Sequence, residues 1–298
     1  MNRLLLIVNP KAGKAQIRKN IISILNTLSA GGCLPSIYLT QGPKDASRAA
    51  EQLAPDFDTI ACYGGDGTLN EVISGVLRSG LDRTIGYIPA GSTNDYAYSL
   101  KLPADVKKSA EILLSGRKQP SDIGMFNGRP FVYVAAFGAF ASTSYTTDQT
   151  AKNIFGHAAY FLEGAKNIVD ISPSHMRVTV GEETIEDDFI FGMISNSESV
   201  GGIHDLLPLT GVQLNDGVFE MLLVRKPETL IDWNDIIACL SARRGDDRLV
   251  YYRQVSRARF QSPFETAWTL DGENGGGQTD AEILVRHRAL DILVPEEA

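Results

Sequence analysis

The fold of this chain is decided by the stretch Thr59-Ile60-Ala61-Cys62-Tyr63-Gly64-Gly65-Asp66-Gly67-Thr68-Leu69-Asn70-Glu71-Val72. Its apolar start is typical of a buried strand, and its glycines allow a tight turn that brings the backbone close to a ligand. Thr68 and Glu71 have capping-box spacing, which predicts a helix that starts at Thr68. A glycine turn followed by a helix N-terminus is a typical phosphate site. Asp66 lies inside this turn, and a carboxylate beside phosphates indicates Mg²⁺.

Predicted strands and helices alternate along the first 120 residues. This alternation indicates an open parallel sheet with helices on both faces, whose strand-to-helix loops lie together at one edge. Open α/β sheets bind ligands at that edge. The predicted strands are 3–8, 36–40, 59–63 and 83–89, the main helices are 17–30, 43–53, 68–77 and 105–115, and the loops are 9–14, Thr40, 64–68 and 90–94.

The pattern changes near residue 120, where short strands with turn signals begin. Asn127-Gly128 is a typical hairpin turn, and regularly spaced short strands predict a β-sandwich. The fold class is therefore α/β plus β, with domains at 1–122 and 123–286 and a C-terminal strand or tail at 287–298 that returns to the first domain. The strands expected in the second domain and tail are 121–126, 129–134, 176–180, 189–195, 219–224, 254–261, 266–270, 282–286 and 290–294, with helices at 153–169 and from Leu230 to Leu240.

The composition limits the compartment and the partners. The net charge is −8, from 28 basic and 36 acidic residues, which argues against nucleic acid as the main partner. Three scattered cysteines provide neither a disulfide framework nor a zinc site, and no apolar run is long enough to span a membrane. We therefore expect a cytoplasmic protein. A run of arginines is either a solvated face or a surface that attracts anionic lipid headgroups. These arginines are Arg243, Arg244, Arg248, Arg253, Arg257 and Arg259.

Three segments resemble the nucleotide loops of the diacylglycerol kinase catalytic-domain family, which includes bacterial soluble lipid kinases and sphingosine kinases. They are residues 9–14, 64–72 and 89–95, and residues 214–220 and 270–273 resemble the late motifs of the same family. NAD kinases and phosphofructokinases share only the Gly-Gly-Asp-Gly loop. The resemblance implies an N-terminal sheet like theirs, followed by a lipid-substrate domain.

The resemblance also implies a reaction, in which the γ-phosphoryl group of ATP moves to the hydroxyl of diacylglycerol and gives phosphatidic acid. Glu273 is the implied general base, although sequence alone also allows Asp271-Gly272-Glu273 to be a hairpin turn with two solvated acids. Asp66 is the implied catalytic Mg²⁺ residue, acting directly or through water. The implied nucleotide-binding residues are Asn9, Pro10, Lys11, Ala12, Gly13, Lys14, Thr40, Gly64, Gly65, Asp66, Gly67, Thr68, Leu69, Asn70, Glu71, Ser92, Asn94 and Lys166.

A second, structural Mg²⁺ is implied at the loop before residue 219. Gln213 and Val218 would bind it by backbone oxygens and Asp216 by its carboxylate, a reasonable oxygen set for a hard cation. Asp122 matches a further acidic position of the metal-binding set.

Other readings stay open. The acceptor could be a sphingoid, a phospholipid headgroup or a soluble metabolite, and a protein of another class would bind nucleotide or lipid without catalysis. A lipid substrate implies action at the membrane surface, peripheral to its inner face. The sequence leaves the oligomeric state open, a homodimer included.

Overall fold

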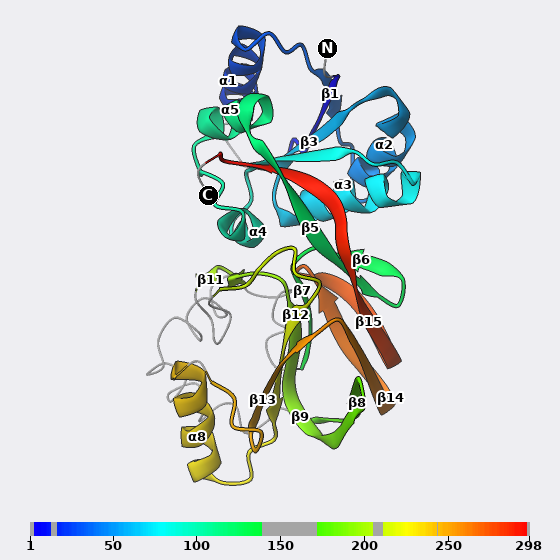
Figure 1. The fold of residues 1–298 in the computed structure, drawn as a ribbon, viewed down its shortest axis with the longest axis vertical. Coiled ribbons are helices and arrows are strands. Elements are labelled where there is room, and N and C mark those ends of the chain that lie inside the picture. The colour runs from blue at the N-terminus through cyan, green and yellow to red at the C-terminus, as the bar shows by residue number, and fades with distance from the viewer. Residues whose placement is uncertain (1–2, 13–16, 139–171, 205–210, 243, 297–298) are drawn as a thin grey trace. The chain divides into compact units, whose positions relative to one another are not determined.

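The computed structural model describes residues 3–12, 17–138, 172–204, 211–242 and 244–296 (Figure 1). The chain divides into two compact units, residues 1–122 with 288–298 and residues 123–287. The helix expected at 153–169 lies outside the described residues. Within the described part of the chain, no helix is both long and apolar enough to cross a membrane.

The first unit is built on a parallel sheet. Apolar strands pair in the order β2-β1-β3-β4, and Ile292 of β15 pairs in parallel with Ile85 of β4. This confirms the α/β character of the first unit. The strands are β1 (Leu4–Val8), β2 (Ser36–Leu39), β3 (Thr59–Gly64), β4 (Thr84–Pro89) and the end of β15 (Glu273–Val294).

Helices cover both faces of this sheet (Figure 1). Apolar side chains of α1 and α5, such as Ile24 and Leu113, form one core with Leu6 and Val8 of β1. On α3, Leu69 and its helical neighbours Val72, Ile73 and Val76 are buried, as the periodicity predicts. The helices are α1 (Ile17–Ala30), α2 (Asp45–Leu53), the 3-10 turn η2 (Ala54–Asp56), α3 (Asp66–Ser79), α4 (Asp95–Ser99) and α5 (Val106–Ser115).

The predicted start of α3 is wrong. The helix begins at Asp66, with Gly65 as its N-cap and no side-chain cap, so Thr68 already lies in the first turn. Gly65 can adopt the extended N-cap conformation without a capping side chain. The polar side chains of this turn bind other loops instead.

The second unit is an antiparallel β structure. Its strands pair in the order β13-β12-β9-β7-β14-β15, β8 pairs with both β9 and β14, and β5 pairs with β6. The hairpin turn at Asn127-Gly128 is confirmed, since both residues have positive φ. The elements are β5 (Arg117–Phe126), β6 (Arg129–Phe131), β7 (Val134–Gly138), β8 (Ser174–Val180), β9 (Glu183–Ser195), β10 (Ser199–Val200), β11 (Ile203–His204), β12 (Phe219–Arg225), α8 (Leu230–Ser241), β13 (Val250–Val255) and β14 (Arg257–Leu270).

Several expected strands have different bounds. Residues 129–134 divide between β6 and β7, and 254–261 divide between β13 and β14 at Ser256. The separate strands at 282–286 and 290–294 are parts of the single strand β15, 22 residues long. Of its glycines, Gly276 pairs with Trp268 and Gly277 with Ala267, and a Cβ on Gly275 would lie 2.9 Å from the Trp268 carbonyl oxygen.

Aromatic side chains fill the core of the second unit. The ring of Trp268 lies 4.8 Å from that of Phe137, 5.0 Å from Phe126 and 5.2 Å from Phe260, measured between centroids. Phe219 of β12 packs edge-on against Phe131. This core fixes which face of each strand is inward, and therefore where the polar residues between these aromatics point.

Candidate active site

Glycines let two predicted nucleotide loops touch through their backbones. A Cβ on Gly91 would lie 2.7 Å from the Cα of Gly65, and a Cβ on Gly64 would lie 2.5 Å from the Thr68 side chain. Larger residues would therefore separate the loop after β3 from the loop after β4. The Ala90 N–H also donates to the Gly64 carbonyl at 2.7 Å, which ties the two loops together.

Asn9 joins the first loop to the second. Its side-chain amide donates to the Thr68 hydroxyl at 3.1 Å, and its own carbonyl oxygen Oδ1 accepts from the Lys11 N–H at 3.0 Å. Asn9 thus orients the start of the 9–14 loop against the first turn of α3.

Asp66 ties the glycine turn to the third loop. Its carboxylate accepts from the backbone N–H groups of Asp95 (3.0 Å) and Tyr96 (3.4 Å) at the start of α4. The hydroxyls of Tyr87 (3.3 Å) and Thr93 (3.4 Å) also donate to this carboxylate. Direct coordination of Mg²⁺ would have to displace one of these donors, whereas contact through a cation-bound water would not.

Glu71 holds the fourth loop. Its two carboxylate oxygens accept from the backbone N–H groups of Lys44 at 2.7 Å and Ala46 at 3.1 Å, at the start of α2. The loop before α2 is fixed a second time by Asp45, which accepts from the Gln41 N–H at 2.7 Å. Thr40, at the start of that loop, is buried, and its N–H donates to the Val8 carbonyl.

These contacts bring all four predicted loops together within the first unit. Leu69 is an exception among the predicted nucleotide residues, since it is an apolar side chain on the buried face of α3. Pro10, Lys11 and Ser92 are exposed, while Gly67, Asn70 and Asn94 are half-buried. Gly13, Lys14 and Lys166 lie outside the described residues.

The predicted base, Glu273, lies in the second unit on the hairpin between β14 and β15. Asp271 and Gly272 have φ of 51° and 80°, which form the two-residue turn between β14 and β15, and Glu273 is the first, exposed residue after it. Asp271 is not solvated: its buried carboxylate accepts from the N–H groups of Val132 (2.7 Å), Tyr133 (2.9 Å) and Val134 (3.1 Å). The hairpin expectation is therefore right, and the expectation of two solvated acids is wrong for Asp271.

The expected structural metal loop precedes β12 in the second unit. Gln213 and Asp216 are exposed, Val218 is half-buried, and the Val218 N–H donates to Asp216 Oδ1 at 3.1 Å. Among the described residues, no three side chains of His, Cys, Asp and Glu lie close enough to share one metal ion. Any cation here would thus depend on the Asp216 carboxylate together with backbone oxygens and water.

Asp122 is fully buried in β5, where it accepts a hydrogen bond of 2.6 Å from the Arg288 N–H. This contact holds two segments of the first unit together, and it gives the carboxylate a structural task beside the metal role implied by the resemblance.

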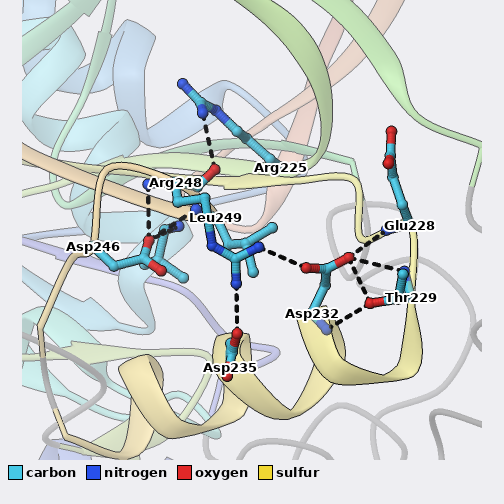
Figure 2. Close-up of polar contacts among 9 residues, drawn as sticks. Arg225, Glu228, Thr229, Asp232, Asp235, Asp246, Arg248 and Leu249 are labelled. Carbon is cyan, nitrogen blue, oxygen red and sulfur yellow. Dashed lines mark hydrogen bonds and ion pairs between the residues drawn. The ribbon is translucent and has the colours of Figure 1, made fainter.

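Four of the six arginines in the predicted run pair with acidic side chains, and Arg243 lies outside the described residues. Arg248 contacts Asp232 at 2.7 Å and Asp235 at 2.5 Å, as Figure 2 shows. Acidic partners at these distances cancel most of the positive charge that would attract anionic lipids. The structure therefore favours the interpretation of this run as a solvated face. The other ion pairs of this run are Arg253–Asp247, Arg257–Glu282 and Arg259–Asp280.

Comparison with known proteins identifies the family. Residues 3–126 match the model of the diacylglycerol kinase catalytic domain. The protein named diacylglycerol kinase of Staphylococcus saprophyticus is 30% identical over 299 residues, covering 99% of this chain and 96% of that protein. The chain belongs to the diacylglycerol kinase family. It is therefore a kinase-type phosphotransferase.

Other proteins of this kind also align with this chain along its whole length. The protein named diacylglycerol kinase from Bacillus subtilis (strain 168) is 29% identical over 299 residues, covering 100% of this chain and 98% of the relative. A crystal structure from Bacillus anthracis strain Sterne shares the fold, with a TM-score of 0.84 at 22% identity, covering 100% of this chain and 98% of the other.

Three residues of the loop cluster were missed at the sequence level. Tyr87, Thr93 and the fully buried Asp95 all surround Asp66. Thr93 and Asp95 lie in the segment that resembles the family's third loop, which was the available signal. Tyr87 is an apolar-looking strand residue, and no local pattern distinguishes it from the core.

Proposed function

We propose that this kinase transfers the γ-phosphoryl group of ATP to the hydroxyl of diacylglycerol or a related lipid, giving ADP and a lipid phosphate. The observation that carries the proposal is the polar cross-linking of four loops at one edge of a parallel sheet, from Asn9–Thr68 to Glu71–Lys44. Phosphoryl transfer depends chiefly on positioning and charge neutralisation, which such a fixed set of loops can supply.

The nucleotide is proposed to bind across these loops, in the domain formed by residues 1–122. Backbone N–H groups near Gly65 and Gly91 would face its phosphates, with Lys11 exposed beside them. Lys14 and Lys166 are proposed as further cations toward the phosphates. Mg²⁺ would neutralise phosphate charge when bound, with Asp66 reaching it through water.

Glu273 is proposed as the general base. Its carboxylate would take the proton of the lipid hydroxyl while the hydroxyl oxygen forms a bond to the γ-phosphorus. The bond between that phosphorus and the bridging oxygen of ADP breaks in the same step, and ADP leaves. Asp271, anchored by three backbone N–H groups, would keep the Glu273 hairpin in place.

The remaining assignments complete the proposal. Residues 123–286 are proposed as a lipid-substrate domain of β-sandwich type, and the N-terminal sheet as a relative of NAD kinase and phosphofructokinase sheets. We propose a cytoplasmic protein that meets its substrate at the inner face of the membrane. The decisive experiment measures transfer of labelled γ-phosphate from ATP to a panel of lipid alcohols in mixed micelles, with a sphingoid and soluble alcohols as competitors. ATP binding without labelled product from any acceptor would reject the proposal. The chain would then be a protein that binds nucleotide or lipid without catalysis.

Glu273→Gln is expected to lower kcat by about 10²- to 10⁴-fold, because the amide cannot accept the proton. Nucleotide affinity, measured by calorimetry, is expected to stay nearly unchanged. Glu265→Gln is the matched control, since Glu265 is an exposed acid on the neighbouring strand β14. Turnover of Glu273→Gln at the level of this control would remove Glu273 as the base.

A further inference from the structure

Tyr63, near the end of β3, carries a hydroxyl inside the core of the first unit. The residue is fully buried and belongs to the core that also contains Val8 of β1 and Ile24 of α1. A phenylalanine ring would fill nearly the same volume, so packing alone does not require the hydroxyl. A buried hydroxyl is costly unless it is hydrogen-bonded, and this one accepts from the Asn20 side-chain amide at 2.8 Å.

Asn20 is the fourth residue of α1, close to the start of the helix, and it is half-buried. Ile24 follows it by four positions, so both side chains lie on the helix face that covers the sheet. The bond to Tyr63 joins residues 43 positions apart. It therefore fixes the beginning of α1 against the carboxyl end of β3.

The backbone of Tyr63 holds the first nucleotide loop at its other end. The Tyr63 carbonyl accepts from the Asn9 N–H at 3.0 Å, directly after the pairing of Val8 with Tyr63. Asn9 begins the loop, and its own carbonyl accepts from the Ala12 N–H at 3.1 Å. Tyr63 thus contacts the chain where it leaves β1, through its carbonyl, and where α1 begins, through its hydroxyl.

We propose that Tyr63 and Asn20 are positioning residues for the nucleotide, because together they fix both ends of the segment that contains loop residues 9–12. Both act through this loop, in which the exposed Lys11 is proposed to lie beside the phosphates. A misplacement of about 1 Å in groups that position a substrate has large effects, so one bond at the base of the loop matters. This role rests on the nucleotide binding proposed for the loop, and it adds two residues that lie outside the loop motifs.

The test compares Tyr63→Phe with the wild-type chain in ATP binding, measured by calorimetry without lipid, and in steady-state phosphoryl transfer. Kd and KM for ATP are expected to rise about 2- to 10-fold, the equivalent of one hydrogen bond, with a smaller change in kcat. Asn20→Ala is expected to give the same rise. The double variant is expected to exceed neither single variant, since each change removes the same bond.

Tyr251→Phe and Asn26→Ala are the matched controls. Tyr251 is a buried tyrosine of β13 in the second unit, and Asn26 is exposed on α1. Both controls are expected to bind ATP like the wild type. In the nucleotide-free chain, hydrogen exchange of the Ala12 amide is expected to be faster in Tyr63→Phe than in either control.

Equal ATP affinity of Tyr63→Phe and Tyr251→Phe would overturn the positioning role and leave the proposed reaction intact. Additive losses in Tyr63→Phe and Asn20→Ala, or unchanged exchange of the Ala12 amide in Tyr63→Phe, would overturn it as well. A wild-type chain that binds no ATP would instead reject the proposed function, and with it the nucleotide role of this contact.

Discussion

Helices α3 and α8 share a sequence pattern at their starts, a threonine followed three residues later by an acid, and they use it in different ways. At α8, the pattern acts within the helix. The Thr229 hydroxyl accepts from the Asp232 N–H at 3.1 Å, and the Asp232 carboxylate accepts from the Thr229 N–H at 2.9 Å (Figure 2). The two residues form a reciprocal capping box.

At α3, the same pattern acts between segments that are distant in sequence. Thr68 accepts from Asn9, 59 positions away, and Glu71 accepts from Lys44, 27 positions away. Gly65 has already begun the helix, so neither side chain is needed as a local cap. The comparison indicates that a capping pattern can be redirected where a glycine turn fixes the helix start, and that the redirected groups order the candidate site.

The largest expected effect follows from Glu71→Ala. Two backbone N–H groups at the start of α2 would lose a charged acceptor, and Lys44, the N-cap of α2, offers no side-chain cap in its place. We expect a loss of about 1–3 kcal/mol in the free energy of unfolding. We also expect a higher KM for ATP with a smaller change in kcat, because the loop that contains Thr40 would be less fixed. Urea denaturation and steady-state kinetics measure both.

Glu51→Ala is the matched control for Glu71. Glu51 pairs with Arg78 at 2.8 Å, but both side chains are exposed, at 42% and 49%. Such pairs contribute about 0–1 kcal/mol, so the control is expected to differ little from the wild type. Glu71→Gln keeps one acceptor oxygen, and its free energy of unfolding is expected to lie between those of Glu71→Ala and Glu51→Ala. If Glu71→Ala were as stable as Glu51→Ala, Glu71 would not hold the loop.

The difference between α3 and α8 also shows which features of the fold could be predicted from the sequence. The buried strands and the glycine loops were readable because their signals are local: apolar runs, and turn residues directly after them. The contacts of Glu71 and Asp66 were not readable, since their backbone partners lie 25 to 30 positions away and belong to ordinary residues. The hydroxyls that also bind Asp66 lie 21 and 27 positions away. The predicted helix start was wrong for the same reason, because the capping pattern does not reveal which distant donors lie near these side chains in the fold.

The second unit shows the same limit: turns could be predicted from local sequence, and distant contacts could not. Asp271-Gly272 was readable as a turn, but the burial of Asp271 follows from the N–H groups of residues 132–134, between β6 and the start of β7 and nearly 140 positions away. Glu220 lies in the segment 214–220 that resembles a late motif of the family, but its burial in β12 was not readable from that motif. The arginine run was readable as a charge pattern, but its neutralisation depended on which acids the strands brought opposite.

A smaller effect is expected from Thr229→Ala at α8. This change removes the side-chain acceptor for the Asp232 N–H, and loss of an N-cap hydroxyl costs about 1 kcal/mol. The effect is expected in stability alone, measured by thermal unfolding with circular dichroism, while KM for ATP stays unchanged. Thr229→Ser, which keeps the hydroxyl, is the control and is expected to remain close to the wild type. A change in KM for ATP would contradict the local role of this cap.

The smallest expected effect is the pH dependence of α8. Arg248, and after it Thr229, lower the pKa of the Asp232 carboxyl from 3.8 to about 2 (Figure 2). Because the pKa in the folded chain is the lower one, the contribution of Asp232 to stability is complete above pH 3.8 and is lost as the pH falls toward 2. The melting-temperature difference between the wild type and Asp232→Asn should therefore be constant from pH 7 to 5 and disappear near pH 2. In Arg248→Ala, where the leading cause of the low pKa is absent, the loss should begin at higher pH. An unchanged difference at pH 2 would mean that the carboxylate charge does not contribute to the cap.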